Sequence, residues 1–75
     1  MINQERLNYA LLKIAAKFRI LRRKSGKTQR EVTKETGQNI GKIEAGKLNI
    51  NISTLHLLCK YYGLTLEEFF DDIGL

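Results

Sequence analysis

An amphipathic pattern near the N-terminus constrains the fold more than any other feature of this sequence. Apolar residues recur there at steps of four, three, four and three, which places them on one face of a helix. They are Leu7, Leu11, Ile14, Phe18 and Leu21, and Ala10 and Ala15 widen the face. Because one apolar face must be covered by other elements, the pattern predicts a long helix that packs against the rest of the chain.

The expected ends of this first helix follow from residues that suit helix termini. Asn3 is expected to cap its N-terminus, because an asparagine side chain accepts a hydrogen bond from a free backbone N–H. Gly26 is expected just beyond its C-terminus. The three basic residues before this glycine suit the negative end of the helix dipole; they are Arg22, Arg23 and Lys24.

Two short helices are predicted in the middle of the chain. Thr28-Gln29-Arg30-Glu31 has the form of a capping box and predicts a helix to about Thr36. Gly37 then supplies a residue that tolerates the positive φ of a tight turn. A third helix is expected to start near Asn39 and to end at Gly46. The helix-turn-helix unit predicted in this way covers about residues 28–45.

Two more helices are predicted in the C-terminal third. After a loop over 47–51, Asn51 or Ser53 can cap a helix that ends at Gly63. Thr65-Leu66-Glu67-Glu68 is a second capping box and opens the last helix. The sequence thus predicts a compact all-α domain of five helices over residues 1–75. The core residues expected from the last three helices are Ile40, Ile43, Leu55, Leu58, Cys59, Tyr62, Leu66, Phe69, Phe70 and Ile73.

Length and composition narrow the class of protein. The chain has 75 residues, no proline, and no apolar run near the roughly 18 residues that span a bilayer. A single cysteine, Cys59, cannot form an internal disulfide, which fits a reducing cytoplasm. His56 and Cys59 are only two potential ligands, whereas structural zinc takes four. We therefore expect no enzyme, metal, cofactor or small-molecule substrate, and a cytoplasmic location.

Charge is distributed unevenly along the chain. Residues 1–50 hold 12 of the 13 Lys and Arg and 4 of the 8 acids, a balance of +8, whereas residues 51–75 have a balance of −3. A basic block of this kind attracts nucleic acid or an anionic membrane, and it can also be a solvated surface. Because the apolar face of the first helix is needed for the core, we expect no membrane binding.

The ordered set of residues from about 18 to 70 resembles the Cro/repressor-type helix-turn-helix proteins, the Xre family. The resemblance implies a lambda-repressor-like fold, double-stranded DNA as partner, a homodimer, and a bacterial or phage transcriptional regulator. It also implies a structural ion pair between Arg22 and Glu44 beneath the DNA face. The matching residues are Arg22, Gly26, Thr28, Gln29, Val32, Gly37, Ile40, Ile43, Glu44, Gly46, Leu55 and Gly63 to Phe69.

The candidate DNA contacts lie in and around the two central helices. Gln29 stands at a helix N-terminus, where free N–H groups and the dipole favour a phosphate. Gln and Asn side chains can read adenine and Lys can reach guanine, although Asn39 is also the expected N-cap. Loop residues after the third helix can grip phosphates or be plain surface. The candidates are Gln29, Arg30, Gln38, Asn39, Gly41, Lys42, Lys47 and Asn49.

Three positions depart from the family pattern. Only Gln38 and Asn39 separate the turn glycine from Ile40, where the family has about five residues, so we expect a shortened recognition helix. Thr33 stands where the family prefers alanine, which predicts looser packing between the two helices. Lys27 replaces an apolar residue before the second helix. The shortened helix keeps open a second function, that of a co-regulator or antitoxin-like subunit that uses this fold to bind protein.

Overall fold

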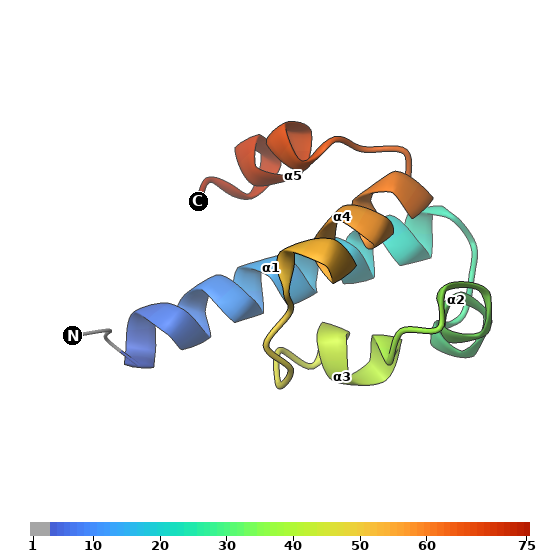
Figure 1. Cartoon of the computed structure of the whole chain (residues 1–75), viewed down its shortest axis with the longest axis horizontal. Helices are drawn as coiled ribbons and strands as arrows, with labels where there is room; N and C mark the ends of the chain where they lie inside the picture. Colours follow the sequence, from blue (N-terminus) through green and yellow to red (C-terminus); the bar gives the residue numbers. More distant parts are fainter. Residues whose placement is uncertain (1–3) are drawn as a thin grey trace.

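The structure, a computed structural model, describes residues 4–75, and it describes side chains from Asn8 onward. Within these residues it contains five helices and no strand (Figure 1), which confirms the expected all-α fold. Asn3, the expected N-cap of the first helix, lies outside the described residues. The helices are α1 (Gln4–Lys24), α2 (Gln29–Thr36), α3 (Ile40–Glu44), α4 (Ile52–Tyr61) and α5 (Leu66–Ile73).

Both predicted capping boxes are present. The Thr28 hydroxyl accepts the Glu31 N–H at 3.1 Å, and the Glu31 carboxylate accepts the Thr28 N–H at 3.2 Å. Thr65 and Glu68 form the same reciprocal pair at the start of α5, with both distances 3.0 Å. Each box satisfies two backbone donors that the helix itself leaves without a partner, so the starts of α2 and α5 are fixed by local sequence.

The C-terminal end of α3 and the N-terminal start of α4 refine the predicted boundaries. The third helix ends at Glu44 rather than at Gly46, because Gly46 adopts a left-handed φ of 70°. An added Cβ at Gly46 would lie 2.9 Å from a methyl carbon of Leu12, so the end of α3 lies against the middle of α1. Of the two candidate caps for α4, Asn51 is the one used, and its side chain accepts the Thr54 N–H at 2.8 Å.

The core draws at least one buried residue from every helix. The Phe18 ring of α1 stacks on the Phe69 ring of α5 with centroids 4.7 Å apart, and both side chains are buried. Burial also raises the pKa of the Cys59 thiol, which keeps it protonated and unreactive. The cluster consists of Phe18, Val32, Ile40, Ile43, Leu55, Leu58, Cys59 and Phe69.

The C-terminal helix lies against the first helix through charged groups as well as apolar ones. Lys13 Nζ donates to the backbone oxygen of Ile73 at 2.7 Å, and Lys17 Nζ lies 3.2 Å from a carboxylate oxygen of Asp72. Figure 1 shows α5 on one side of α1, with α2 and α3 on the other. The acidic end of the chain therefore covers lysines of α1 and leaves the α2–α3 side uncovered.

Candidate nucleic-acid interface

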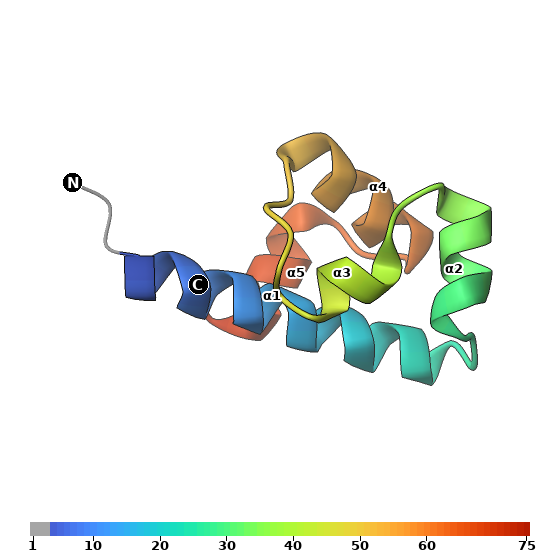
Figure 2. The ribbon, with the colours of Figure 1, turned by 90° about the horizontal axis from the view of Figure 1, so that it is seen from below.

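One side of the molecule is formed by α2, α3 and the segment that joins α3 to α4. Figure 2 looks onto this side, with α1 along one margin and α4 along the other. All of it except Asn51 comes from the basic first fifty residues. The side chains that fix α2 against α3 lie beneath this surface, and they determine how any surface group is presented.

A buried ion pair lies at the centre of this arrangement. Glu44, at the end of α3, has a side chain only 1% exposed, and that of Arg22 in α1 is 13% exposed. Arg22 Nε donates to Glu44 Oε2 at 2.7 Å, and Nη2 donates to Oε1 at 3.0 Å. This bidentate geometry is the strong form of an arginine–carboxylate contact. The pair that the family resemblance implies is thus formed. The hydrogen bond from Arg22 to Glu44 raises the pKa of Arg22 above its usual value.

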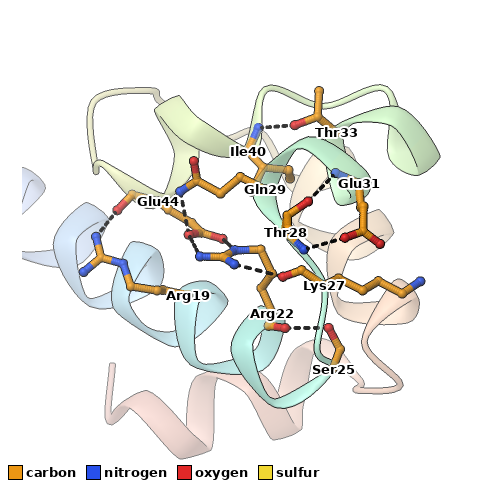
Figure 3. A network of polar contacts seen from close by, with 10 residues as sticks. All are labelled: Arg19, Arg22, Ser25, Lys27, Thr28, Gln29, Glu31, Thr33, Ile40 and Glu44. Atoms are coloured by element: carbon orange, nitrogen blue, oxygen red, sulfur yellow. Dashed lines mark hydrogen bonds and ion pairs between the residues drawn. The ribbon is translucent and has the colours of Figure 1, made fainter.

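The same carboxylate holds Gln29, at the first position of α2. Gln29 Nε2 donates to Glu44 Oε1 at 3.0 Å, so one oxygen of Glu44 accepts from both α1 and α2 (Figure 3). The Gln29 side chain is nevertheless exposed, and its amide oxygen points away from Glu44. A surface amide at a helix N-terminus is thereby held in one orientation by a buried anion.

Two further hydrogen bonds extend this network to the loop and to the backbone of α3. Arg22 Nη1 donates to the backbone oxygen of Lys27 at 2.9 Å, which fixes the chain just before α2. Arg19 Nη2 donates to the backbone oxygen of Glu44 at 3.0 Å, at the carbonyl end of α3. Sequence reasoning missed the role of Arg19, because nothing local indicates that residue 19 lies beside residue 44.

The short turn between α2 and α3 is stabilised by a threonine hydroxyl. Gly37 adopts a φ of 73° and ends α2. The Thr33 hydroxyl accepts the N–H of Ile40 at 3.2 Å, and Asn39 caps α3 by accepting the N–H of Lys42 at 3.1 Å. Thr33 thus supplies an acceptor for a first-turn N–H of α3, a role that the expectation of looser packing did not include.

Replacing Thr33 with valine is expected to destabilise the domain by about 1–3 kcal/mol, because the backbone N–H of the buried Ile40 loses its acceptor while the side-chain shape is kept. Urea unfolding followed by circular dichroism measures this change. Thr33→Ser retains the hydroxyl and should lose much less stability. Equal losses in the two variants would contradict the assigned hydrogen bond.

The three candidate residues nearest to the turn are already engaged with the protein. Asn39 is exposed, but its side-chain oxygen is used in the cap of α3. Gln38 is half-buried, and its side-chain oxygen accepts from the Thr54 hydroxyl of α4 at 3.5 Å. A Cβ added at Gly41 would lie 3.6 Å from Gln29 Oε1, so this glycine faces α2 rather than open space.

The remaining candidates present charge or amide groups to solvent. Arg30 lies in the first turn of α2, Lys42 lies in α3, and Lys47 and Asn49 lie in the segment after α3. All four are exposed. In the part of the chain that the structure describes, their side chains form no hydrogen bond or ion pair. They are therefore available to an external anion.

Two helices joined at a left-handed glycine, with the second helix short and its end anchored to α1, form a helix-turn-helix unit. A family model with the description Helix-turn-helix matches residues 18–69. The chain belongs to the helix-turn-helix family. The match begins at Phe18 and ends at Phe69, so it includes the Arg22–Glu44 pair and all of α2, α3 and α4. Comparisons with curated proteins and with solved structures gave no significant match.

Membership of this family identifies a DNA-binding regulator in general terms, of the Cro/repressor type of helix-turn-helix protein. Its fold is lambda-repressor-like. Among the described residues there is no group of three or more side chains that could hold a metal ion. The helices within the same residues are too short or too polar to cross a membrane.

Lys27 of this helix-turn-helix domain points away from Gln29 (Figure 3). Its ammonium donates to the Glu35 carboxylate at 2.9 Å and to the Tyr61 hydroxyl at 2.8 Å. The hydrogen bond to Tyr61 and then that to Glu35 raise the pKa of Lys27. Lys27 thus joins the loop before α2 to the end of α2 and to α4, and its charge is engaged within the protein rather than directed to the α2–α3 surface.

Proposed function

We propose that this helix-turn-helix domain binds double-stranded DNA in a sequence-specific manner, as a transcriptional regulator of the Cro/repressor type and as a homodimer. In this proposal it is not an enzyme, and it acts on DNA in the cytoplasm of a bacterium. The observation that carries the proposal is the exposed Gln29 amide, held by the buried Glu44 carboxylate. A group that is already oriented loses little conformational freedom on binding, which favours recognition.

Gln29 and the four unengaged polar side chains have separate roles in this proposal. Gln29 meets a phosphate with the Nε2 hydrogen that Glu44 leaves free, at the N-terminus of α2, where free N–H groups and the dipole favour an anion. Arg30, Lys47 and Asn49 hold the phosphate backbone, which positions the protein without reading sequence. Lys42 is the exposed side chain of α3 with the reach for a guanine edge in the major groove.

Base reading by Gln38, Asn39 and Gly41 is more limited in this proposal. The side-chain oxygens of Gln38 and Asn39 are engaged within the protein, so each would offer a base mainly its amide N–H donors. Gly41 contributes close approach of the α3 backbone rather than a side-chain contact.

A second candidate function is protein recognition, as a co-regulator or an antitoxin-like subunit. The observation that favours it is the length of α3, which has only five residues. A recognition helix this short presents few side chains to a groove. The same α2–α3 surface can instead receive an acidic segment of a partner protein, because Arg30, Lys42 and Lys47 on it are not paired with any residue that the structure describes.

Selection of bound duplexes from a random pool tests the proposal directly. We expect a recovered palindrome with half-sites about 34–36 Å apart, as a two-fold symmetric dimer requires. Affinity should fall by on the order of 100-fold between 50 and 200 mM salt for about four phosphate contacts. Binding to every duplex with no preferred sequence would contradict specific recognition and favour the protein-binding function.

A matched pair of lysine variants separates local contact from net charge. Lys42→Ala is expected to weaken the specific complex by about tenfold for each half-site, because each copy of the dimer loses one good contact. Lys60→Ala in α4 removes the same charge outside the α2–α3 surface, and it should change affinity much less. Equal effects of the two variants would mean that Lys42 makes no direct contact with DNA.

A further inference from the structure

One face of α1 carries a row of exposed apolar side chains that the described residues cover only in part, at Leu12. Tyr9 is 58% exposed, Leu12 56% and Ile20 47%, and Ala16 between them is also exposed. A helix turns about 100° per residue, so these positions lie together on the side opposite the buried Phe18. They are called the α1 stripe below. An apolar row of this length on a small protein is typical of an interaction surface.

We propose that the α1 stripe is covered by the same stripe of a second copy of this chain, with the two α1 helices antiparallel and the two-fold axis at Ala16. The argument is the symmetry of the sequence about that residue. Leu12 lies four residues before Ala16, and Ile20 lies four residues after it. An antiparallel pair that crosses there places Leu12 of each copy against Ile20 of the other, with the smallest side chain at the point of closest approach.

The ends of the stripe are complementary in the same register. Tyr9 lies seven residues before Ala16, and Arg23, which is exposed, lies seven residues after it. The antiparallel pair therefore places an arginine at each tyrosine, where a guanidinium is attracted to the face of an aromatic ring. Lys13 Nζ lies 5.3 Å from the centroid of the same ring, so the arginine of the second copy has to approach the ring face that Lys13 leaves free.

A shallow groove lies beside Ala16, on the α5 side of the stripe. It has a volume of about 380 Å³, and four of its lining residues are Lys13, Ala16, Lys17 and Ile20, with α5 closing one side. Positions i, i+3, i+4 and i+7 of a helix form the hole that receives one side chain of a facing helix. The groove residues of α1 occupy these positions, so a second helix that runs along α1 would lie next to the groove.

The antiparallel arrangement also suits the proposed binding of DNA. This part of the argument rests on the proposed function, whereas the pairing itself does not. In Figure 2, α1 lies along one margin of the face that carries α2 and α3. Rotation by 180° about the line of sight places a second α1 antiparallel to the first and keeps both α3 helices facing the same side. The two α3 helices then lie on one face of the dimer, where a single duplex can meet both.

The pairing is expected to be weak in the absence of DNA. The stripe from Tyr9 to Arg23 is about 21 Å long, so it buries less area than a standard stable interface. Lys13 and Arg19 on its flanks bring like charges of the two copies together. Added salt screens this repulsion and should strengthen the dimer. Added salt should weaken DNA binding. Dimer formation and DNA binding therefore respond to salt in opposite directions.

Disulfide crosslinking tests the register. The native Cys59 is buried and takes no part in the reaction. We expect Ala16→Cys to form a disulfide dimer on mild oxidation at about 100 µM protein, because the two-fold axis places both thiols together. Leu12→Cys mixed with Ile20→Cys should give mainly the mixed dimer. His56→Cys, exposed on α4, is the control and should remain monomeric. Crosslinking no greater than in this control would overturn the proposal.

A charge substitution separates the dimer from DNA binding. Ala16→Glu places two carboxylates at the two-fold axis and should weaken self-association in sedimentation equilibrium at least tenfold, whereas His56→Glu should not. Binding to a random-sequence duplex requires no dimer, and the Ala16→Glu chain should retain it. If the original protein does not bind the duplex, the proposed function alone is contradicted. If Ala16→Glu self-associates as strongly as the original protein, the proposed pairing through the α1 stripe alone is contradicted.

Discussion

Replacing Glu44 with alanine is expected to destabilise the domain by about 3–5 kcal/mol, because it leaves the largely buried Arg22 guanidinium without its counter-charge. Gln29 Nε2 loses its acceptor in the same substitution. A chain of 75 residues has a total free energy of unfolding of roughly 4–11 kcal/mol. The loss is therefore a large part of the whole, and we expect the melting temperature to fall by about 12–40 °C.

Thermal unfolding followed by circular dichroism compares Glu44→Ala with a control variant, Glu35→Ala. Glu35 forms an ion pair with Lys27 in which both side chains are well exposed, and its removal should cost less than about 1 kcal/mol. An unchanged melting temperature in Glu44→Ala would refute the structural role of the buried pair.

Removing both members of the pair separates stability from recognition. Arg22→Met combined with Glu44→Leu fills the same space with apolar groups, and such replacements are often neutral for stability. Most of the lost stability should return in the double variant. Gln29 still lacks its anchor there, so the double variant should bind duplex DNA more weakly than the unaltered protein.

Replacing Phe69 with alanine is expected to cost about 3–5 kcal/mol, the usual range for a buried phenylalanine. Phe69 is fully buried and its ring stacks on that of Phe18, so its removal opens a cavity between α5 and α1. Urea unfolding measures the lost free energy of unfolding, provided that the dependence of this free energy on urea concentration is the same in both proteins. Phe70→Ala is the matched control, because Phe70 is only half-buried, and a loss as large as that of Phe69→Ala would mean that α5 docks differently.

The helix ends and the core could be predicted from the sequence because their signals are local or periodic. Thr28 and Glu31 define the start of α2 within four residues, and Phe18 belongs to a repeating apolar pattern. The C-terminal apolar residues were harder to assign. Phe69 closes the core, whereas Leu75 is 51% exposed, and their spacing does not separate these two outcomes.

The polar network of the site could be predicted only where the family resemblance indicated it. Arg22 and Glu44 were expected to pair, but the position of Gln29 on the same carboxylate was not. These residues come from three different helices, and side-chain distances across helices follow from packing rather than from sequence spacing. The hydrogen bond from Ile40 to Thr33 depends in the same way on the conformation of the shortened turn.

The docking of α5 on α1 has a consequence for the rate of association with DNA. Asp72 neutralises Lys17 on the side of α1 away from α3, while Arg30, Lys42 and Lys47 on the α2–α3 side have no acidic partner among the described residues. The protein therefore carries an electric dipole as well as a net charge. In the field of a polyanion such a dipole exerts a torque that turns the basic side forward during diffusion. A larger share of encounters then starts in a productive orientation, before any contact forms.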